Sequence, residues 1–326
     1  MKFYHGKNTM KLISVYHEDE ILLGIQSTKG ILVPLLGTPQ LDLNEVSMLK
    51  NMVAFITAGN DARSLAYRLI NEAPTSAWQA PETIKIAVPF LPSTILCAGS
   101  NYRDHNAEKA DSPTSGKEPE FFIKTADSVI GPDCTIIHEP SLTQKLDCET
   151  ELAIVIGKEG RCIPHEKALD YAFGYTIAND VTARDRQVRT KNGIVWYDLA
   201  RGKAFDTSAP LGPCVVTSDE IADPQSLTLK TWINGELRQS SNTAHMIWTC
   251  ADLIQFFSVS FTLKPGMIII TGTPAGTAWS VDDELGGKWG EVEGLVPATR
   301  YCLPGDVVES EIQNIGRLRN TIGAAR

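Results

Sequence analysis

Short apolar runs separated by polar turns make up the first part of the chain. Residues 11–36 hold three such runs, which is typical of a small β-meander. Residues 44–72 change to a helical period, so we expect a helix there. Its apolar stripe would be formed by Val46, Leu49, Val53 and Ile56.

Prolines interrupt the pattern at residues 71–81 and predict a linker, because each removes a backbone donor and disfavours helix before it. We therefore expect a small N-terminal domain over residues 1–85 and a catalytic domain over residues 86–326. The pattern of the second domain is strand-rich and predicts a mostly β fold with α/β elements. Its expected strands are 84–88, 94–98, 121–124, 149–156, 174–179, 211–217, 227–233, 267–271 and 307–312.

Two local signals refine this picture. Asn234-Gly235 lies between two strand-like runs, which is a strong signal for a tight hairpin. Residues 244–257 have a helical period, with an expected apolar face of Ile247, Leu253, Ile254 and Phe257.

The strand expected at residues 149–156 carries two carboxylates. Glu149 and Glu151 are two positions apart, so in a strand they project to the same side, roughly 7 Å apart at their backbones. Leu152, Ile154 and Ile156 would form the opposite face. Burying two neighbouring acids is costly, so a cation, a basic partner or water has to meet them.

Asp180 follows the strand expected at 174–179 and is a third candidate acid. Three carboxylates, with no histidine or cysteine joining them as a ligand, match the preference of Mg²⁺ or Mn²⁺ for oxygen. A Glu-x-Glu pair alone is more often a solvated or salt-bridged face of a strand. The neighbouring motifs therefore decide between the two interpretations.

His105 and Glu108 follow a strand that ends at Gly99, and Ser100 or Asn101 could cap the helical turn that brings them to one face. A carboxylate beside an imidazole orients the ring and raises its basicity, as a water-activating base requires. Such a pair in isolation is usually a surface ion pair.

Composition excludes several classes of function. The chain has 326 residues, with 30 Lys and Arg against 39 Asp and Glu, so the net charge of −9 argues against a nucleic-acid partner. The sequence has no signal-like apolar core and no apolar run of membrane-spanning length, which predicts a cytoplasmic protein without a membrane partner. The seven cysteines lack zinc-ligand spacing, so we expect reduced thiols.

Several motifs along the chain together resemble the fumarylacetoacetate hydrolase family. The resemblance spans about residues 90–323, and the first 85 residues are similar to the variable small domain of the family only loosely. It implies a mixed β-sandwich roll and a homodimer. The motifs are residues 99–105, 122–124, 147–152, 174–180, 182–187, 202–207 and 271–276.

The resemblance also implies a role for each candidate residue. Glu149, Glu151 and Asp180 would bind Mg²⁺ or Mn²⁺, and His105 with Glu108 would activate water. Lys203 would face the developing oxyanion or enolate, Arg184 and Gln187 would hold oxygens of a small 2-keto acid, and Thr273 its carboxylate. The alternatives are a surface pair of Lys203 with Asp206, surface positions for Arg184 and Gln187, and a turn-shaping role for Thr273.

The resemblance implies a metal-dependent hydrolase that cleaves a carbon–carbon bond of an acylpyruvate-like or fumarylacetoacetate-like dioxo acid. A divalent ion would stabilise the enolate that leaves. The same enolate serves decarboxylation and tautomerisation. An oxaloacetate-type decarboxylase and a hydroxymuconate-type isomerase are therefore the alternatives, and a non-catalytic binding paralogue is a further one.

The chain departs from the family pattern in two places, and a third segment could gate the site. Cys148 replaces the aromatic residue that is more frequent in the family. The segment 277–303 is longer than in many relatives, and it either borders the pocket or a dimer contact or is a surface insertion. Residues 109–118 follow the dyad and could form a lid.

Overall fold

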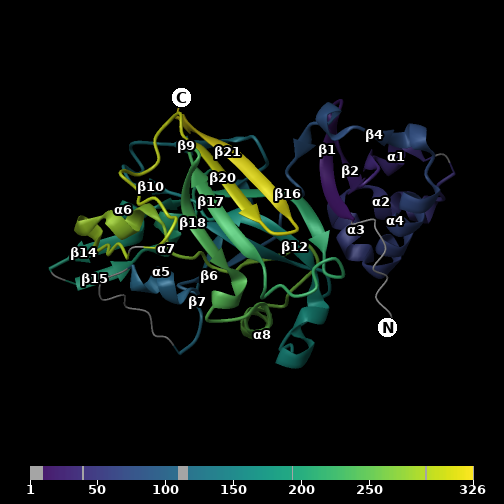
Figure 1. Cartoon of the computed structure of the whole chain (residues 1–326). Helices are drawn as coiled ribbons and strands as arrows, with labels where there is room; N and C mark the ends of the chain where they lie inside the picture. Colours follow the sequence, from purple (N-terminus) through teal and green to yellow (C-terminus); the bar gives the residue numbers. More distant parts are fainter. Residues whose placement is uncertain (1–9, 39, 109–116, 193, 291, 326) are drawn as a thin grey trace.

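A large mixed sheet joins the N-terminal and C-terminal parts of the chain (Figure 1). The computed structural model describes residues 10–38, 40–108, 117–192, 194–290 and 292–325. The strands of this sheet are β1 (Lys11–His17), β2 (Glu20–Ser27), β3 (Gly30–Leu32), β4 (Trp78–Gln79), β5 (Ile86–Ala87), β6 (Ile95–Gly99), β7 (Glu120–Lys124), β8 (Val129–Ile130), β11 (Thr150–Ile156), β12 (Ala172–Asn179), β16 (Ala209–Thr217) and β19 (Ile268–Ile270). Their order is β4-β3-β2-β1-β16-β12-β11-β19-β6-β7, with β5 beside β1 and β8 beside β16.

The predicted meander is confirmed, but the predicted helix is divided into three. These are α2 (Leu43–Leu49), α3 (Met52–Ala58) and α4 (Asn60–Glu72), after the single turn α1 (Pro34–Gly37). Asn51 caps α3 through its side chain, and Gly59 ends it at a φ of 61°. These breaks reset the helical phase. The predicted apolar stripe is therefore confirmed for Leu49 and Ile56, which are buried. It is wrong for Val46 and Val53, which are 38% and 39% exposed.

The N-terminal strands share both a sheet and a core with the rest of the chain. β1 pairs with β16, and β4, from the predicted linker, pairs with β3. One buried cluster joins Leu23 of β2 with Val155 of β11 and Phe173 of β12. The domain boundary at residue 85 stays a prediction.

We expect Leu23→Ala to lower the free energy of unfolding of the whole chain by about 2–5 kcal/mol, because it leaves a cavity in this shared core. The matched control Leu43→Ala alters a side chain that is 90% exposed. It should change the free energy of unfolding by less than about 0.5 kcal/mol. Urea unfolding followed by circular dichroism measures both. If Leu23→Ala unfolds an N-terminal segment separately and leaves the main transition unchanged, the core is not shared.

The second sheet contains five strands in the order β18-β17-β20-β21-β9. Their bounds are β9 (Thr135–His138), β17 (Thr228–Ile233), β18 (Glu236–Asn242), β20 (Val307–Ile312) and β21 (Gly316–Ala324). The predicted hairpin at Asn234-Gly235 is confirmed. Both residues have positive φ, 52° and 81°, and join β17 to β18. With these two sheets, the predicted mostly β fold is confirmed.

Shorter elements surround the ends of the sheets. The two-stranded ribbons are β10 (Leu146–Asp147) with β13 (Thr182–Ala183) and β14 (Val188–Lys191) with β15 (Ile194–Tyr197). The short helices here are α5 (Arg103–Ala107), α6 (Arg184–Gln187) and α7 (Leu199–Lys203). Figure 1 shows α5, α6 and α7 on the side of the molecule away from the N-terminal elements.

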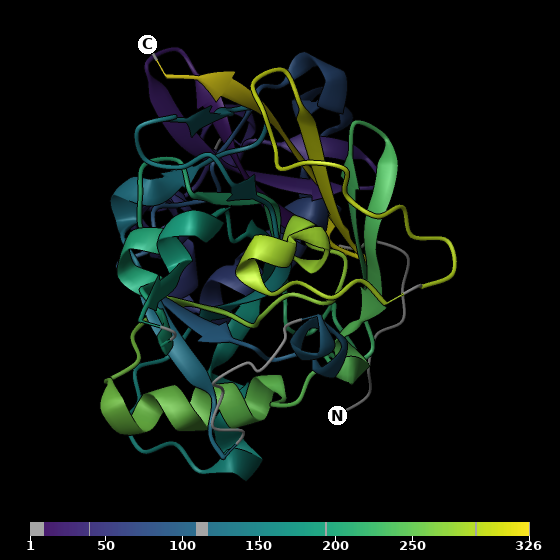
Figure 2. The same cartoon turned by 90° about the vertical axis from the view of Figure 1, so that its left-hand side faces the viewer.

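Helix α8 (Cys250–Ser260) lies below the sheets in Figures 1 and 2. It begins six residues later than the sequence predicts, because Thr249 and Asp252 form a capping box there. Leu253, Ile254 and Phe257 form its buried face as expected, whereas Ile247 precedes the helix.

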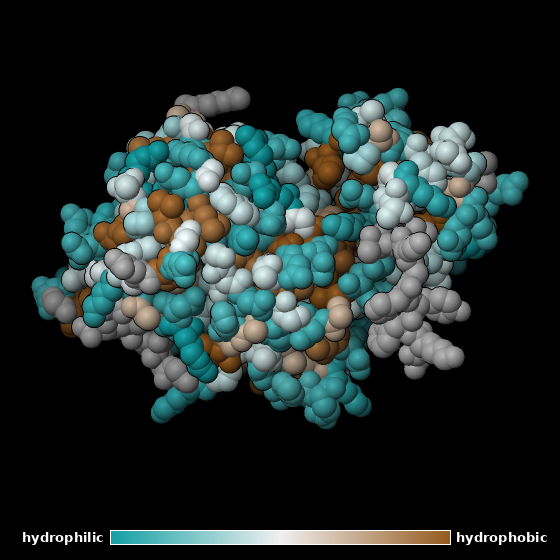
Figure 3. Space-filling model, in the orientation of Figure 1, coloured by the Kyte–Doolittle hydropathy of each residue, from teal (hydrophilic) through white to brown (hydrophobic). Residues whose placement is uncertain are grey.

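The surface carries no single wide apolar band in the view of Figure 3. Hydrophilic residues lie there among small hydrophobic groups. In the part of the chain that the structure describes, none of the helices has the length and apolar character needed to cross a membrane.

Candidate metal centre

Three buried carboxylates meet where β11 begins and β12 ends. Glu149, Glu151 and Asp180 each offer an oxygen, and these atoms lie within 4.8 Å of one another. The side chains are only 1–3% exposed. The Asp180 N–H donates to the Glu149 carbonyl oxygen at 2.8 Å, which ties the two strand ends together.

The alternation of faces expected for β11 is confirmed by its packing. Leu152, Ile154 and Ile156 belong to one buried cluster, and Ala153 and Val155 to the other. Residues 151, 153 and 155 are two positions apart, so the Glu151 side chain projects from the same face of β11 as Ala153 and Val155. The predicted pairing of carboxylates on one side of a strand therefore positions two of the three acids.

Three cations offset part of the negative charge. Lys203 Nζ donates to Glu149 Oε2 and to Asp180 Oδ2, both at 2.6 Å. Lys124 Nζ, from β7, donates to Asp180 Oδ1 at 2.7 Å, and Arg184 donates to Glu149 Oε1 at 2.5 Å. Lys203 is only 3% exposed, so the surface pair with Asp206 is excluded.

The pKa values of Glu149 and Glu151 are shifted in opposite directions. Burial alone would raise the pKa of Glu149, but the charges of Arg184 and Lys203 hold it well below its usual range. Burial raises the pKa of Glu151 well above its usual range, and repulsion by Asp180 and Glu149 adds to this effect. Glu151 accepts the Gly272 N–H at 2.5 Å.

The donor set fits a divalent cation. It consists of hard carboxylate oxygens from three residues, as Mg²⁺ and Mn²⁺ prefer. A bound cation would offset the repulsion that Asp180 and Glu149 exert on Glu151. Glu149, Glu151 and Asp180 would therefore hold the ion.

The raised pKa of Glu151 predicts that Mn²⁺ binding releases a proton. Above the usual value of 4.5 and up to the raised pKa, the folded metal-free protein keeps this carboxyl protonated, so the ion must displace the proton. The apparent Kd should fall about tenfold per pH unit in that window. Titration calorimetry in two buffers of different ionisation enthalpy measures the release, and binding that exchanges no proton would contradict it.

His105 and Glu108 form the predicted pair at the edge of this cluster. His105 Nδ1 lies 2.9 Å from Glu108 Oε2, and His105 Nε2 lies 3.9 Å from Glu149 Oε1. Glu108 Oε1 accepts the Gly276 N–H at 2.6 Å. Both members are buried, so this pair is not a surface ion pair.

The predicted cap of this helical turn is wrong. Helix α5 begins after Tyr102 and has no side-chain cap. Asn101 instead bridges two distant segments, since its amide donates to the carbonyl oxygens of Trp248 and Thr271. The turn is therefore held by tertiary contacts, which a local capping rule does not include.

Arg184 is fully buried and donates to three side chains of the protein. Its Nε donates to Asp147 at 2.9 Å, and its other nitrogens donate to Gln187 Oε1 at 2.9 Å and to Glu149. This geometry makes Arg184 a positioning residue. Its direct contact with substrate stays a prediction.

Gln187 and Thr273 both line the pocket beside the carboxylates. Since Gln187 Oε1 accepts from Arg184, its amide NH₂ is directed elsewhere and can donate to a substrate oxygen. The Thr273 hydroxyl accepts from Gln239 and donates to the Thr150 carbonyl oxygen at 3.1 Å. That bond uses its only hydrogen, so its predicted contact with a substrate carboxylate stays untested.

Sequence reasoning missed Lys124 and Asp147 as parts of the site. Lys124 belongs to a family motif but had no assigned role, because its contact with Asp180 joins residues 56 positions apart. Asp147 accepts from Arg184 and from the N–H groups of Ala278 and Trp279. The position of Asp147 two residues before Glu149 was the available signal.

The first part of the segment 277–303 borders the site. The Trp279 ring lies 5.2 Å from the Arg184 guanidinium and 6.0 Å from the Tyr197 ring. The Lys288 N–H donates to the Glu108 carbonyl oxygen at 2.7 Å. Most of the predicted lid, residues 109–116, lies outside the described residues.

A small pocket opens onto the three carboxylates. It brings together β6, β7, α7 and the turn after β19. Its lining residues are Ala98, Gly99, Ser100, His105, Glu120, Phe122, Glu149, Glu151, Asp180, Gln187, Tyr197, Leu199, Lys203, Gly272 and Thr273.

The chain belongs to the fumarylacetoacetate hydrolase family. Residues 94–323 match the family described as fumarylacetoacetate (FAA) hydrolase C-terminal. A solved structure of a fumarylacetoacetate hydrolase from Exiguobacterium antarcticum is similar with a TM-score of 0.75 and 30% identity, covering 97% of this chain and all of that one. The predicted resemblance is confirmed.

Several relatives bear the name of one reaction, among them a rat and a bacterial protein. The rat protein "Oxaloacetate tautomerase Fahd2a, mitochondrial" is 36% identical over 311 residues, 94% of this chain and 88% of the relative. "Oxaloacetate tautomerase YisK" of Bacillus subtilis is 38% identical over 236 residues, 72% of this chain and 71% of the relative. The prediction that the chain is an enzyme of this family is supported, whereas the carbon–carbon hydrolase type is not.

Proposed function

We propose that this protein catalyses the keto–enol tautomerisation of a small 2-oxo diacid such as oxaloacetate, with Mg²⁺ or Mn²⁺ as cofactor. Two relatives named oxaloacetate tautomerase support this isomerase alternative over the hydrolase hypothesis. The observation that carries the proposal is the position of His105, whose Nε2 lies 3.9 Å from the Glu149 carboxylate. This position directs a basic nitrogen toward a substrate at the carboxylate cluster.

The bound ion would supply Lewis-acid stabilisation of negative charge on the keto oxygen. His105 Nε2 takes a proton from the carbon between the keto group and the distal carboxylate. The C–H electrons form the new carbon–carbon double bond, and the carbonyl π electrons move to oxygen. A proton then returns to that oxygen, which gives the enol, and the reverse sequence gives the keto form.

The protein holds the proton on His105 between these two transfers. Glu108 accepts from Nδ1 at 2.9 Å, which fixes the tautomer with Nε2 as the base and stabilises the imidazolium that forms. The Gly276 N–H in turn fixes Glu108. Because the pair is buried, it transfers the proton in a site largely shielded from water.

Lys203 supplies a fixed positive charge to the same reaction. Although burial lowers the pKa of this amine, the charges of Asp180 and Glu149 raise it above its usual value, so the ammonium persists. Its position against both carboxylates brings it next to the developing enolate oxygen. Gln187 can donate to another substrate oxygen through its amide NH₂.

A direct assay distinguishes the three reactions proposed for this family. The purified chain with Mg²⁺ or Mn²⁺ should accelerate the interconversion of enol-oxaloacetate and its keto form, followed by the ultraviolet absorbance of the enol. Cleavage of acetylpyruvate to acetate and pyruvate without this activity would favour the hydrolase. Release of carbon dioxide from oxaloacetate as the only catalysed change would favour the decarboxylase.

We expect His105→Gln to lower kcat for tautomerisation by about 10²–10⁴-fold, the usual contribution of a general base. Binding of Mn²⁺, measured by electron paramagnetic resonance, should remain, because His105 is not one of the three carboxylate ligands. The matched control His17→Gln changes an exposed residue on β1 and should leave both unchanged. Wild-type turnover in His105→Gln would exclude this residue as the base.

The homodimer, the cytoplasmic location and the absence of a nucleic-acid partner stay predictions. The rat relative carries the word mitochondrial in its name. The choice between Mg²⁺ and Mn²⁺ belongs to the proposal as well, since both suit a cluster of three carboxylate oxygens.

A further inference from the structure

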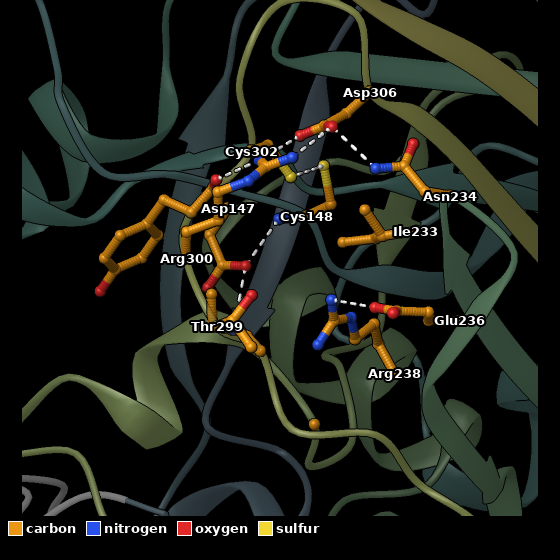
Figure 4. A pocket seen from close by; sticks show the side chains of 14 residues that line it. Asp147, Cys148, Ile233, Asn234, Glu236, Arg238, Thr299, Arg300, Cys302 and Asp306 are labelled. Atoms are coloured by element: carbon orange, nitrogen blue, oxygen red, sulfur yellow. Dashed lines mark hydrogen bonds and ion pairs between the residues drawn. The ribbon is translucent and has the colours of Figure 1, made fainter.

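A second cavity, of about 180 Å³, has two thiols among its lining side chains (Figure 4). Cys148 Sγ and Cys302 Sγ face each other across 3.9 Å on its wall. The same cavity is lined by Asp147, which holds Arg184 beside Glu149. Asp147 therefore connects the wall of this cavity to Glu149 through Arg184.

The loop that carries Cys302 is fixed by one carboxylate. Asp306 accepts from both terminal nitrogens of Arg300, at 2.6 and 2.8 Å. It also accepts from the Leu303 N–H and from the Asn234 side chain, each at 2.8 Å. These bonds fix the loop on both sides of Cys302, the residue whose sulfur faces Cys148.

The backbones beside the two thiols belong to the metal-site scaffold. The Cys302 N–H donates to the Leu146 carbonyl oxygen at 2.8 Å, and the Cys148 N–H donates to Asp147 Oδ1 at 3.0 Å. Cys148 lies between Asp147 and Glu149 in the sequence. A displacement of either sulfur therefore acts on the segment that carries the first carboxylate of the cluster.

We propose that Cys148 and Cys302 form a peroxide-reactive modification site, whose product is an intramolecular disulfide that weakens divalent-metal binding. The effect on metal binding rests on the proposed function, because it requires Glu149 to be a ligand. The formation of the disulfide does not depend on that function. The oxidant is hydrogen peroxide, which the cavity is large enough to admit.

The oxidation is balanced by one peroxide. The Cys148 sulfur attacks a peroxide oxygen, the O–O bond breaks, and a sulfenic acid and one water form. The Cys302 sulfur then attacks the Cys148 sulfur, the S–O bond breaks, and the S–S bond forms as a second water leaves. The two thiols lose two electrons, and their protons end in the two waters.

Closing the pair requires a movement of the scaffold. A disulfide holds its sulfurs about 2.05 Å apart, so the present separation of 3.9 Å must fall by roughly 1.9 Å. Asp147 is buried and accepts four hydrogen bonds, from Arg184, Ala278, Trp279 and the neighbouring Cys148 N–H. A shift there changes how Arg184 and Glu149 lie, and loss of such outer contacts costs about 10–100-fold in metal affinity.

The test treats the reduced full-length chain with hydrogen peroxide and then alkylates the remaining thiols. Mass spectrometry should find five alkylated cysteines in place of the seven of the reduced chain, since 7 − 2 = 5, and a linked peptide pair that contains Cys148 and Cys302. The Kd for Mn²⁺ should rise about 10–100-fold and recover after treatment with a thiol reductant. Seven alkylated cysteines, or a linked pair with an unchanged Kd, would overturn the proposal.

Two variants separate the pair from general oxidation. Cys302→Ser removes the second sulfur, and its Kd for Mn²⁺ should not respond to peroxide. Cys214→Ser changes another buried cysteine, whose Sγ contacts the Ile315 carbonyl oxygen, and it should respond as the wild type does. An equal peroxide response in Cys302→Ser would contradict the proposal.

The same measurements keep this proposal separate from the proposed function. If the reduced protein binds no Mn²⁺, the proposed metal centre is contradicted. The linked peptide pair reports on Cys148 and Cys302 in either case, because its formation requires no bound ion.

Discussion

The repulsion among three buried carboxylates is the constraint on which the rest of the site depends. Glu149, Glu151 and Asp180 are held together by the pairing of β11 with β12, and all three are buried. Their charge must be met by other groups. Lys203, Lys124 and Arg184 meet part of it. Burial, together with repulsion by Asp180 and Glu149, still raises the pKa of Glu151.

This electrostatic requirement connects segments that are distant in the chain. Arg184 links the cluster to Asp147, and Asp147 links it to the backbone of Ala278 and Trp279. Gly276, in the turn before them, fixes Glu108 and with it His105. The three carboxylates, the His105–Glu108 pair and the segment after β19 therefore form one hydrogen-bonded unit. The large sheet supplies rigid strand ends for it.

The sequence predicts those features that local pattern controls. Alternation in β11 places Glu151 correctly, and the Asn234-Gly235 turn predicts its hairpin, because both depend on a few neighbouring residues. Features set by tertiary contacts were missed. The breaks beside Asn51 divide a predicted helix, and Lys124 reaches Asp180 from another strand. Residue pattern proposed the three carboxylates and the His105–Glu108 pair, and the family resemblance added the other candidate residues. Only the geometry shows that Arg184 donates to protein groups.

The most direct test of the central claim is a crystal structure of the chain with Mn²⁺ and oxalate, an analogue of the enolate. Anomalous scattering should locate one Mn²⁺ between Glu149, Glu151 and Asp180, with oxalate completing its coordination and the Lys203 ammonium displaced from at least one carboxylate. If the cluster holds no Mn²⁺ and Lys203 still bridges Glu149 and Asp180, the account is contradicted.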